Sequence, residues 1–590
     1  MGHRESFWGV PLPNFPQWKQ NFRLIWKAPT LRDKLHVTHK LVQLDTEKSI
    51  FSNGTLDGNR DLDPVPPEQR TWRAWDFMTY WASDQFTFAT WGFGSTMVAQ
   101  GFTLREIVPL TFFGMVLTGT VCALSGYVGS DYRIGFPVSS RLSWGVRMSW
   151  FPVLVRAFMA LMWLGILNIN LAQAFHQMFR AIWPEFDNIP NALPADAGIT
   201  SADLLCYFIL LIIQTPLTMI PIYKLKWFFL FKAVLSPFVF FGSMIWAFVV
   251  TKDGGVLVTQ SAHLTGTEWE KHWERVKAFG YAAGFFSTVC TNIPDFARFA
   301  KTSRGLWMQA LALPLTGVIP VICATITSSA TIQLYGESYW SPTLILAQWH
   351  NRAAVFFAAV IWIIANIGVN LSANTVTVAI ALSSFAPKYI NNIRGAWLVA
   401  LLSIIIVPWK IVNDGGSFYN FLGAYPPLLG PISGILMSDY WLVRRGRIDV
   451  RHLYIGKGGK FWFFYGCNWR AIVAYLAAYA PNLPGFIHQV SPNIPNVQPY
   501  TYDLNWVFAV IVAAVVFWAL NWAVPPRYSL SGGSVHPDDV IDWSTGTRIG
   551  DWEGIDDSVV VGVPEVETET SVKHQTQSAA GEVKDGSESA

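Results

Sequence analysis

The chain has 590 residues, of which 52% are hydrophobic and only 14% charged, and its formal net charge at pH 7 is +3. Ordinary soluble proteins carry about 25% charged residues, so this composition is typical of a membrane protein. The small, scattered net charge excludes the basic surface stripe expected of a nucleic-acid-binding protein. The cysteines lie far apart without metal or redox spacing, and we expect no metal site.

The first 70 residues predict a polar cytoplasmic arm. Lys and Arg are scattered through it, and the Pro-rich run at 59–67 favours an extended approach to the membrane. The N-terminus lacks the apolar core of a cleavable signal peptide, and the first long apolar segment begins near Phe77.

Twelve apolar segments of about 18–25 residues follow, the length that a bilayer requires. They lie near residues 77–101, 106–128, 151–176, 203–222, 226–250, 278–300, 307–334, 353–384, 394–412, 417–443, 470–490 and 503–523. Lys and Arg gather in the loops after every second segment, which predicts that both termini are cytoplasmic. We therefore expect an all-α polytopic membrane protein, with twelve transmembrane helices in residues 71–525.

The C-terminal composition changes to Ser, Gly, Asp, Glu and Thr, and residues 551–590 are acidic and nearly free of aromatic residues. This pattern predicts a disordered cytoplasmic tail over residues 526–590. The tail either carries signals for trafficking or ubiquitylation machinery or is a solvated end without a specific partner.

Enzyme motifs are absent from the sequence: it has no Walker loop, dinucleotide fingerprint, nucleophile elbow or zincin motif. We expect no enzyme, and a transporter fits better because two apolar segments carry helix breakers. The first contains Trp91-Gly-Phe-Gly94, and the sixth contains Gly284, several polar residues and Pro294. Broken helices five apart predict two inverted repeats, about 77–250 and 278–443, followed by extra helices at 470–523.

Three asparagines of the eighth segment, Asn366, Asn370 and Asn374, are each four residues apart and share one helical face. Intramembrane amides either hold helices together or bind a substrate. We favour binding or coupling roles for Asn370 and Asn374 and leave both alternatives open for Asn366.

Aromatic rings beside such amides suit a flat heterocycle, which stacks on a ring while amides read its edge. The candidate platforms are Trp91, Trp163 and Phe285, which lie on the two broken segments or on the third segment opposite them.

Several motifs occur in unbroken order over about residues 60–525. They are Asp61-Leu-Asp-Pro64, Arg70-Thr-Trp72, Gly135-Phe-Pro-Val138, Arg141-Leu-Ser-Trp-Gly145, Asn292-Ile-Pro-Asp-Phe296, Asn370-Leu-Ser-Ala-Asn374, Leu429-Gly-Pro431, Asp439-Tyr-Trp-Leu442 and Asn468-Trp-Arg-Ala471. In these motifs the chain resembles the nucleobase–cation symporter-1 family, and within it the fungal Fur-type permeases for uracil, allantoin and uridine. Thiamine and nicotinamide-riboside permeases belong to the same branch.

The resemblance implies a leucine-transporter-like fold and proton-coupled uptake at the plasma membrane, with no cofactor. It places the family's stacking Trp on Trp163, its substrate-reading Asn on Asn374 and its sixth-helix aromatic on or near Phe285. The chain departs from the family at Leu167, where pyrimidine and allantoin permeases have Gln. The sodium-binding Ser-Thr of bacterial relatives falls on Gly368-Val369, which disfavours sodium coupling.

Proton coupling requires a titratable group inside the bundle, and the candidates for coupling or gating are Asp84, Lys232, Arg156 and Asp295. Asp84 and Asp295 lie at comparable ends of the two broken segments and are candidates for gating ion pairs with Lys232, Arg156 or Arg298. Structural pairing is the alternative, and we favour it for most of these groups. The sequence leaves the proton carrier open.

We therefore expect a plasma-membrane secondary transporter that imports a small heterocycle such as a nucleobase, allantoin or a nucleoside. The alternatives are a thiamine-type permease of the same family and a non-transporting nutrient sensor on the same fold. Leu167 leaves the choice of substrate open.

Overall fold

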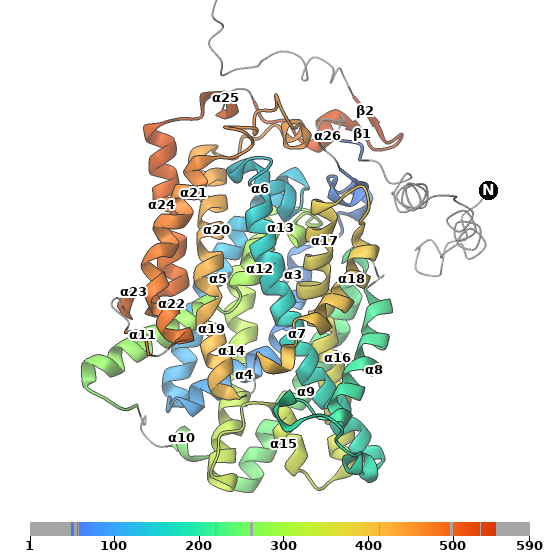
Figure 1. Ribbon diagram of the computed structural model, residues 1–590, viewed down its shortest axis with the longest axis vertical. Coiled ribbons are helices and arrows are strands. Elements are labelled where there is room, and N and C mark those ends of the chain that lie inside the picture. Colours follow the sequence, from blue (N-terminus) through green and yellow to red (C-terminus); the bar gives the residue numbers. More distant parts are fainter. Residues whose placement is uncertain are drawn as a thin grey trace, which may run out of the picture. The chain divides into compact units, whose positions relative to one another are not determined.

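The computed structural model describes residues 49–51, 56, 58–218, 220, 222–259, 264–411, 414–491, 493–495, 499–530 and 533–549. Long helices between residues 74 and 523 run side by side (Figure 1). The first half of the chain forms α3 (Ala74–Gln85), α4 (Phe88–Ala99), α5 (Leu104–Tyr132), α6 (Phe136–Trp144), α7 (Trp150–Ile182), α8 (Ser201–Leu217), α9 (Lys226–Thr251), α10 (Val256–Thr259), α11 (Glu268–Gly284), α12 (Ser287–Asn292) and α13 (Pro294–Ala297).

The second half continues with α14 (Met308–Tyr335), α15 (Pro342–Gln348), α16 (Arg352–Val369), α17 (Val376–Phe385), α18 (Asn392–Ile405), α19 (Gly415–Ala424), α20 (Pro426–Ser438), α21 (Trp469–Tyr479), α22 (Leu483–Val490), α23 (Pro499–Asp503), α24 (Asn505–Ala523), α25 (Arg527–Leu530) and α26 (Pro537–Val540). A π-helical turn, Asn370–Thr375, joins α16 to α17. A short antiparallel hairpin pairs β1 (Ile541–Asp542) with β2 (Thr547–Arg548).

The expected membrane spans fall on these helices. Among the described residues, seven helical stretches are long and apolar enough to cross a membrane: Leu104–Tyr132, Trp150–Ile182, Lys226–Thr251, Ser303–Tyr335, Arg352–Phe385, Gly415–Val443 and Asn505–Ala523. Ser201–Leu217 and Asn392–Ile405 are shorter apolar helices. Of the other expected spans, 77–101 falls on α3 and α4, 278–300 on α11, α12 and α13, and 470–490 on α21 and α22. The all-α membrane architecture is confirmed, and the count of twelve spans stays a prediction.

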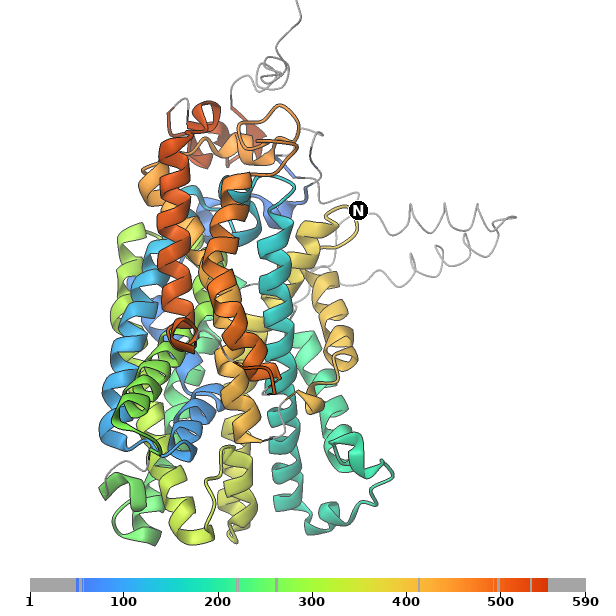
Figure 2. The ribbon, with the colours of Figure 1, turned by 60° about the vertical axis from the view of Figure 1, so that its left-hand side comes forward.

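Two groups of helices meet around the broken segments. α14 packs against α3, α4, α5 and α9, whereas α7 packs against α8, α16 and α17. α24 lies beside α20 and α21, and both ribbon views show α21 and α24 as neighbours (Figures 1 and 2). The first broken helix, α3 and α4, thus belongs to the group around α14, whereas α12 of the second broken helix contacts α5, α20 and α7.

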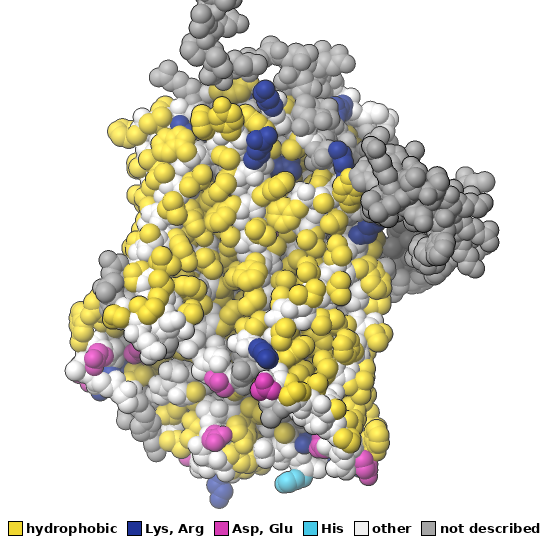
Figure 3. Space-filling model, viewed as in Figure 1, with side chains coloured by type: hydrophobic (Ala, Val, Ile, Leu, Met, Phe, Trp, Pro, Cys, Tyr) yellow, Lys and Arg dark blue, Asp and Glu magenta, His cyan; other side chains and the backbone are white. Residues whose placement is uncertain are grey.

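The outer surface separates apolar from charged side chains. Figure 3 shows hydrophobic side chains covering the middle of this face, with Lys and Arg mostly near one end and Asp and Glu near the other. The outward side of α9 presents Val234, Phe238, Ile245 and Val249, each more than half exposed. Apolar groups exposed in a continuous belt are stable against lipid tails rather than water.

The prediction that the first helix breaks at Trp91-Gly-Phe-Gly94 is wrong. Residues 88–99 form the continuous helix α4, and the break lies between Gln85 and Phe88. The glycines serve close packing instead: a Cβ at Gly92 would lie 2.8 Å from the Phe418 ring, and one at Gly94 would lie 3.0 Å from the Val321 carbonyl oxygen. Glycine lets α4 approach its neighbours without interrupting the helix.

The predicted boundary of the disordered tail, residue 526, is also wrong. Residues 527–549 contain α25, α26 and the hairpin, and Val535 donates its backbone N–H to Ile448 O over 2.9 Å. Asp538 accepts two hydrogen bonds of 2.6 Å from the guanidinium of Arg70. Backbone pairing and an ion pair thus hold a polar segment in place. Residues 550–590 lie outside the described part of the chain.

Candidate functional site

The break in the first helix is stabilised by Asn366 on α16. The Asn366 side-chain oxygen accepts the backbone N–H of Phe88, the first residue of α4, over 2.9 Å. The amide nitrogen of Asn366 donates to Trp362 O over 2.8 Å. An interrupted helix inside a membrane needs such partners for its free backbone groups. Of the two alternatives for Asn366, the structure supports the structural role.

We expect Asn366→Leu to destabilise the protein by about 1–3 kcal/mol, because the buried N–H of Phe88 loses its acceptor. Thermal unfolding of the purified protein in detergent measures this loss as a lower melting temperature. Asn366→Asp keeps an acceptor oxygen for the Phe88 N–H and should lose less stability than Asn366→Leu. Equal melting temperatures for Asn366→Leu and the parent would contradict the capping role.

The second broken helix interrupts where the sequence predicts it. α11 ends at Gly284, two residues connect it to α12, and Pro294 begins α13. A Cβ at Gly284 would lie 2.8 Å from Pro426 Cβ, so α20 approaches closely at this point. Tyr425 donates its hydroxyl to the free carbonyl of Phe285. The Tyr425 side chain thus satisfies one of the backbone carbonyl groups that the break leaves without a helical partner.

Trp163 on α7 stands among four aromatic rings. Its ring centroid lies 6.0 Å from that of Phe285, 6.1 Å from Phe418, 5.2 Å from Phe421 and 5.7 Å from Tyr425, with ring planes nearly perpendicular. Trp163 is 6% exposed, and its indole N–H has no hydrogen-bond partner among the described residues. An enclosed indole with a free donor suits a flat polar ring.

Trp91, predicted as a third platform, lies apart from this group. Its ring contacts are with Phe240 on α9 and Trp362 on α16. Phe93, two residues on, approaches Phe285 with centroids 5.3 Å apart. Residues two apart in a helix point to nearly opposite sides, so only one of the two rings can face Phe285.

Three rings in and directly after α19 were not predicted from the sequence, although their spacing carries a signal. Phe418, Phe421 and Tyr425 follow one another at three and four residues, which places them on one helical face. In a chain rich in aromatic residues, this spacing alone does not separate a binding face from an ordinary buried face. Their contact with Trp163 is what assigns these rings to the candidate site.

The π-helical turn carries the predicted amides. Asn374 donates its amide N–H to the side-chain oxygen of Asn370 over 2.9 Å, and Asn370 donates to the side-chain oxygen of Asn168 on α7 over 2.8 Å. All three residues are buried. π turns are frequent at functional sites because they shift side chains out of helical register. We call the chain formed by Asn374, Asn370 and Asn168 the amide ladder.

Leu167 lies directly before Asn168 and one helical turn after Trp163. The side chain is only 1% exposed. It is part of the same apolar cluster as Trp163 and Phe285. The position that carries an amide in the resembling permeases therefore belongs to the buried apolar lining here.

Asp84 and Lys232 form a buried ion pair next to the first break. Lys232 Nζ lies 4.0 Å from Asp84 Oδ1, and neither atom has a hydrogen-bond partner among the described residues. A Cβ at Gly368 on α16 would lie 2.7 Å from Lys232 Cδ and 3.2 Å from Nζ. The Lys232 ammonium thus lies directly beside the backbone at Gly368.

Arg156 and Asp295 are joined through the side chain of Asn292: Arg156 Nε donates to Asn292 Oδ1 over 3.0 Å, and Asn292 Nδ2 donates to Asp295 Oδ2 over 3.1 Å. Both side chains also bind backbone groups. Arg156 donates to Thr288 O over 2.6 Å and to Ala373 O over 3.1 Å, which joins α12 to the π turn. Asp295 accepts the backbone N–H of Phe136 at the start of α6 over 2.8 Å. Within the described residues, neither side chain has an ion-pair partner within 4.0 Å. Of the ion pairs expected for these acids, the described residues contain the one between Asp84 and Lys232.

Cavities lie towards both ends of the bundle. One of about 750 Å³ is lined by Arg60, Asp61, Arg298 and Trp543, at the end that carries residues 533–549. Another, of about 190 Å³, is lined by Ile166 and Asn170 of α7 and by aromatic residues of the connections at Trp340 and Trp409. Trp163, Phe285 and Asn374 are all less than 9% exposed, so the central site is enclosed between the two.

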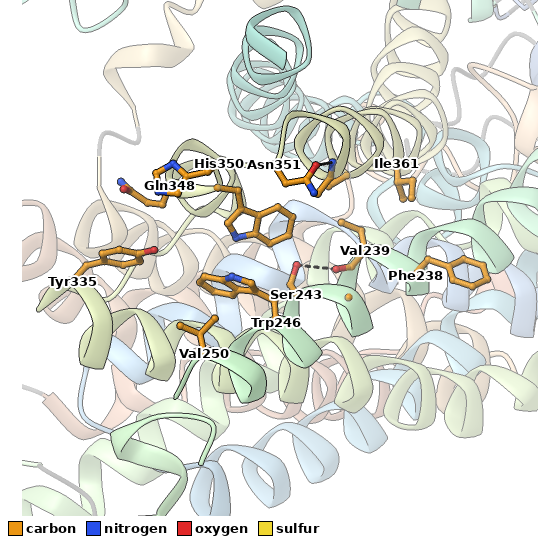
Figure 4. Close-up of a pocket in the computed structure, with 14 residues that line it drawn as sticks. Phe238, Val239, Ser243, Trp246, Val250, Tyr335, Gln348, His350, Asn351 and Ile361 are labelled. Carbon is orange, nitrogen blue, oxygen red and sulfur yellow. Dashed lines mark hydrogen bonds between the residues drawn. The ribbon is translucent and has the colours of Figure 1, made fainter. Parts of the chain in front are cut away.

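A third cavity, of about 560 Å³, lies between α9 and the start of α16 (Figure 4). Trp246 and Trp349 meet beside it with ring centroids 5.6 Å apart. The Ser243 hydroxyl there is occupied by a hydrogen bond to Val239 O. None of the predicted site residues lines this cavity, which separates it from the candidate site.

Comparisons with known proteins agree with this geometry. A family model described as permease for cytosine/purines, uracil, thiamine and allantoin matches residues 64–519. The allantoin permease of Saccharomyces cerevisiae is 32% identical over 486 residues, which cover 79% of this chain and 76% of that permease. The uridine permease of the same yeast is 32% identical over 495 residues, or 82% of this chain and 77% of that one.

A solved structure supports the fold. The structure of Mhp1, a nucleobase-cation-symport-1 family transporter, in a closed conformation with bromovinylhydantoin bound, matches with a TM-score of 0.64 at 21% identity. The match covers 80% of this chain and 97% of that one. It confirms the predicted leucine-transporter-like fold class of an all-α polytopic membrane protein.

Proposed function

We propose a function from one premise: this chain belongs to the family of permeases for cytosine/purines, uracil, thiamine and allantoin, and it is a secondary transporter for small heterocycles. Its substrate is a flat ring of the nucleobase, nucleoside or allantoin type. The ring binds against Trp163, and Asn374 reads its edge. The observation that carries this proposal is the enclosed indole of Trp163, with its free N–H, between two broken helices.

Protons are the coupling ion in this proposal. Asp84 and Lys232 are buried at 2% and 0% exposure, and at a separation of 4.0 Å neither Asp84 Oδ1 nor Lys232 Nζ has a hydrogen-bond partner among the described residues. A separated buried charge pair is costly unless it is well hydrogen-bonded. Adding or removing one proton changes the charge of this pair, and so changes the stability of the contact between α3 and α9. That change is the means by which proton binding biases the opening of the bundle.

Sodium coupling is disfavoured by the same contact. Gly368 and Val369 offer no side-chain oxygen for a hard cation. The aliphatic chain of Lys232 passes so close to Gly368 that a Cβ there would lie 2.7 Å from Cδ, and the lysine would have to move to make room for a side chain. In this proposal the Lys232 ammonium supplies the positive charge that a bound sodium ion would otherwise supply. Apart from the transported substrate and protons, the proposal requires no cofactor.

The proposed location is the plasma membrane, with both termini in the cytoplasm. The chain is a multi-pass membrane protein, and the basic end of the surface in Figure 3 is the end that carries residues 533–549 in Figure 1. The positive-inside rule then places this end in the cytoplasm. Trafficking or ubiquitylation machinery is the candidate partner of residues 550–590, which lie outside the described part of the chain, and a solvated end without a partner is the alternative.

Uptake of labelled compounds tests the function directly. Cells without their own permeases would express the chain and receive uracil, allantoin, uridine, cytosine, purines, thiamine and nicotinamide riboside in turn. Saturable uptake of one of the flat heterocycles, increasing as the external pH falls, is expected. Uptake of thiamine alone would favour the vitamin-permease alternative. No uptake of any compound at normal surface expression would favour a nutrient sensor.

We expect Leu167→Gln to create or improve uptake of uracil or allantoin. The new amide would lie one turn from Trp163 and offer the donor and acceptor that the resembling permeases have at this position. One added hydrogen bond corresponds to roughly a tenfold lower KM. Competition uptake with both compounds measures the change.

Leu171→Gln is the matched control for this prediction. Leu171 is also fully buried on α7, one turn further along, so the variant buries the same amide elsewhere. It should lose stability without gaining uptake. Unchanged selectivity in Leu167→Gln at normal surface expression would show that Leu167 does not set the substrate.

A further inference from the structure

The amide ladder has a direction. Asn374 donates to Asn370, and Asn370 donates to Asn168, so the oxygen of Asn374 is left as the free group at one end. The opposite direction would form the same number of hydrogen bonds within the ladder, but it would leave the Asn374 N–H free instead. The direction therefore decides whether Asn374 offers a substrate an acceptor or a donor.

The far end of the ladder meets a tyrosine that fixes this direction. The Asn168 amide lies beside the hydroxyl of Tyr207 on α8. That hydroxyl donates its proton to Ser403 O on α18 over 2.9 Å. Its oxygen can therefore face Asn168 only as an acceptor. The amide nitrogen of Asn168 makes no close hydrogen bond to the described residues, so it is the group available to that oxygen.

Reversing the ladder would turn the oxygen of Asn168 towards the oxygen of Tyr207. Two acceptors would then face each other in a buried site, where an unpaired polar group costs most. Asn168, Asn370 and Tyr207 are each completely buried, at 0% exposure. No water-exposed group competes for the contact between Asn168 and Tyr207. Tyr207 and Ser403 therefore keep the hydrogen bonds of the amide ladder in the direction from Asn374 to Asn168.

We propose that Asn168 and Tyr207 are positioning residues that orient Asn374, so that the site presents a hydrogen-bond acceptor and selects heterocycles with a ring N–H. This inference rests on the proposed function, because it assumes that Asn374 reads the substrate. The selected chemistry is a lactam or imide N–H, as in uracil. A ring with a bare nitrogen at the corresponding position, as in cytosine, is disfavoured.

Competition between uracil and cytosine tests the inference, with uptake of the chain's own substrate as the readout. The parent should be inhibited more strongly by uracil. Asn168→Leu leaves the Asn370 N–H without an acceptor, which favours reversal of the remaining pair. Tyr207→Phe keeps the ring and removes the oxygen that opposes reversal. In both variants we expect the ratio of the two inhibition constants to shift towards cytosine by about tenfold.

Two controls separate orientation from folding. Asn168→Asp keeps an acceptor for Asn370 and should retain the parental ratio. Asn521→Leu removes a buried amide of α24 that donates to Phe517 O over 2.7 Å, and should also leave the ratio unchanged. A purely structural role for Asn168 would change the amount of protein or the uptake rate without changing the ratio.

An unchanged ratio in both Asn168→Leu and Tyr207→Phe would overturn the inference and leave the proposed function intact. An equal shift in Asn168→Asp and Asn168→Leu would also overturn it, because the acceptor would then be irrelevant. Failure of both bases to inhibit the parent would instead count against the proposed nucleobase-type site itself.

Discussion

Replacing Asp84 by Asn and Lys232 by Met together is expected to give a folded protein that exchanges substrate but no longer accumulates it. The double variant removes both charges of the buried pair, and such replacements are often neutral or stabilising by about 1–4 kcal/mol. It also removes the pair whose protonation, in the proposed function, couples the proton gradient to transport. Purified protein in liposomes should therefore equilibrate labelled substrate at the same level with and without a pH gradient.

The single variants should behave differently from the double variant. Lys232→Met leaves Asp84 charged in an apolar site, which destabilises by about 3–5 kcal/mol, and little protein should reach the surface. Lys271→Met is the matched control, because Lys271 pairs with Glu268 over 2.9 Å on the exposed side of α11. It should keep full coupling. Accumulation by the double variant at the parental level would exclude Asp84 and Lys232 as the coupling groups.

The sequence predicted the architecture well because its signals are long. Segment length, apolar composition and the distribution of Lys and Arg each average over many residues, so a single misplaced residue matters little. The break at Gly284 was also predicted correctly, because helix breakers and polar residues cluster around it. The break in the first helix was misplaced by several residues, because glycine serves close packing and helix interruption alike.

Candidate site residues could be proposed from the sequence only where spacing or resemblance singled out a residue. Asn370 and Asn374 stand out because amides are rare in membrane helices. Their partner Asn168 lies on another helix, and no local pattern could join them. Phe93 was not predicted, because the sequence analysis placed a helix break at this point. In the continuous helix, Phe93 and Trp91 lie on nearly opposite sides. The pairing of Lys232 with Asp84 across 148 positions likewise required the tertiary structure.

Asn374→Ala is expected to raise the KM for the transported heterocycle by about 10- to 100-fold, because a polar partner of the ring edge is lost at a cost of roughly 1–3 kcal/mol. The same change leaves the side-chain oxygen of Asn370 without its donor, so the amide ladder also loses order. Saturation uptake, normalised to surface protein, separates KM from the maximal rate. Because the backbone of the π turn is unaffected, the maximal rate should fall less than the affinity.

Asn482→Ala provides the matched control for this change. Asn482 is buried and donates its amide to Ala478 O over 3.0 Å, within a helical segment outside the site. Its loss should lower stability slightly and leave KM at the parental value. If Asn374→Ala reaches the surface normally and transports with the parental KM, Asn374 does not contact the substrate. The direction of the ladder would then serve helix packing alone, and the acceptor that selects a ring N–H would have to come from another side chain around Trp163.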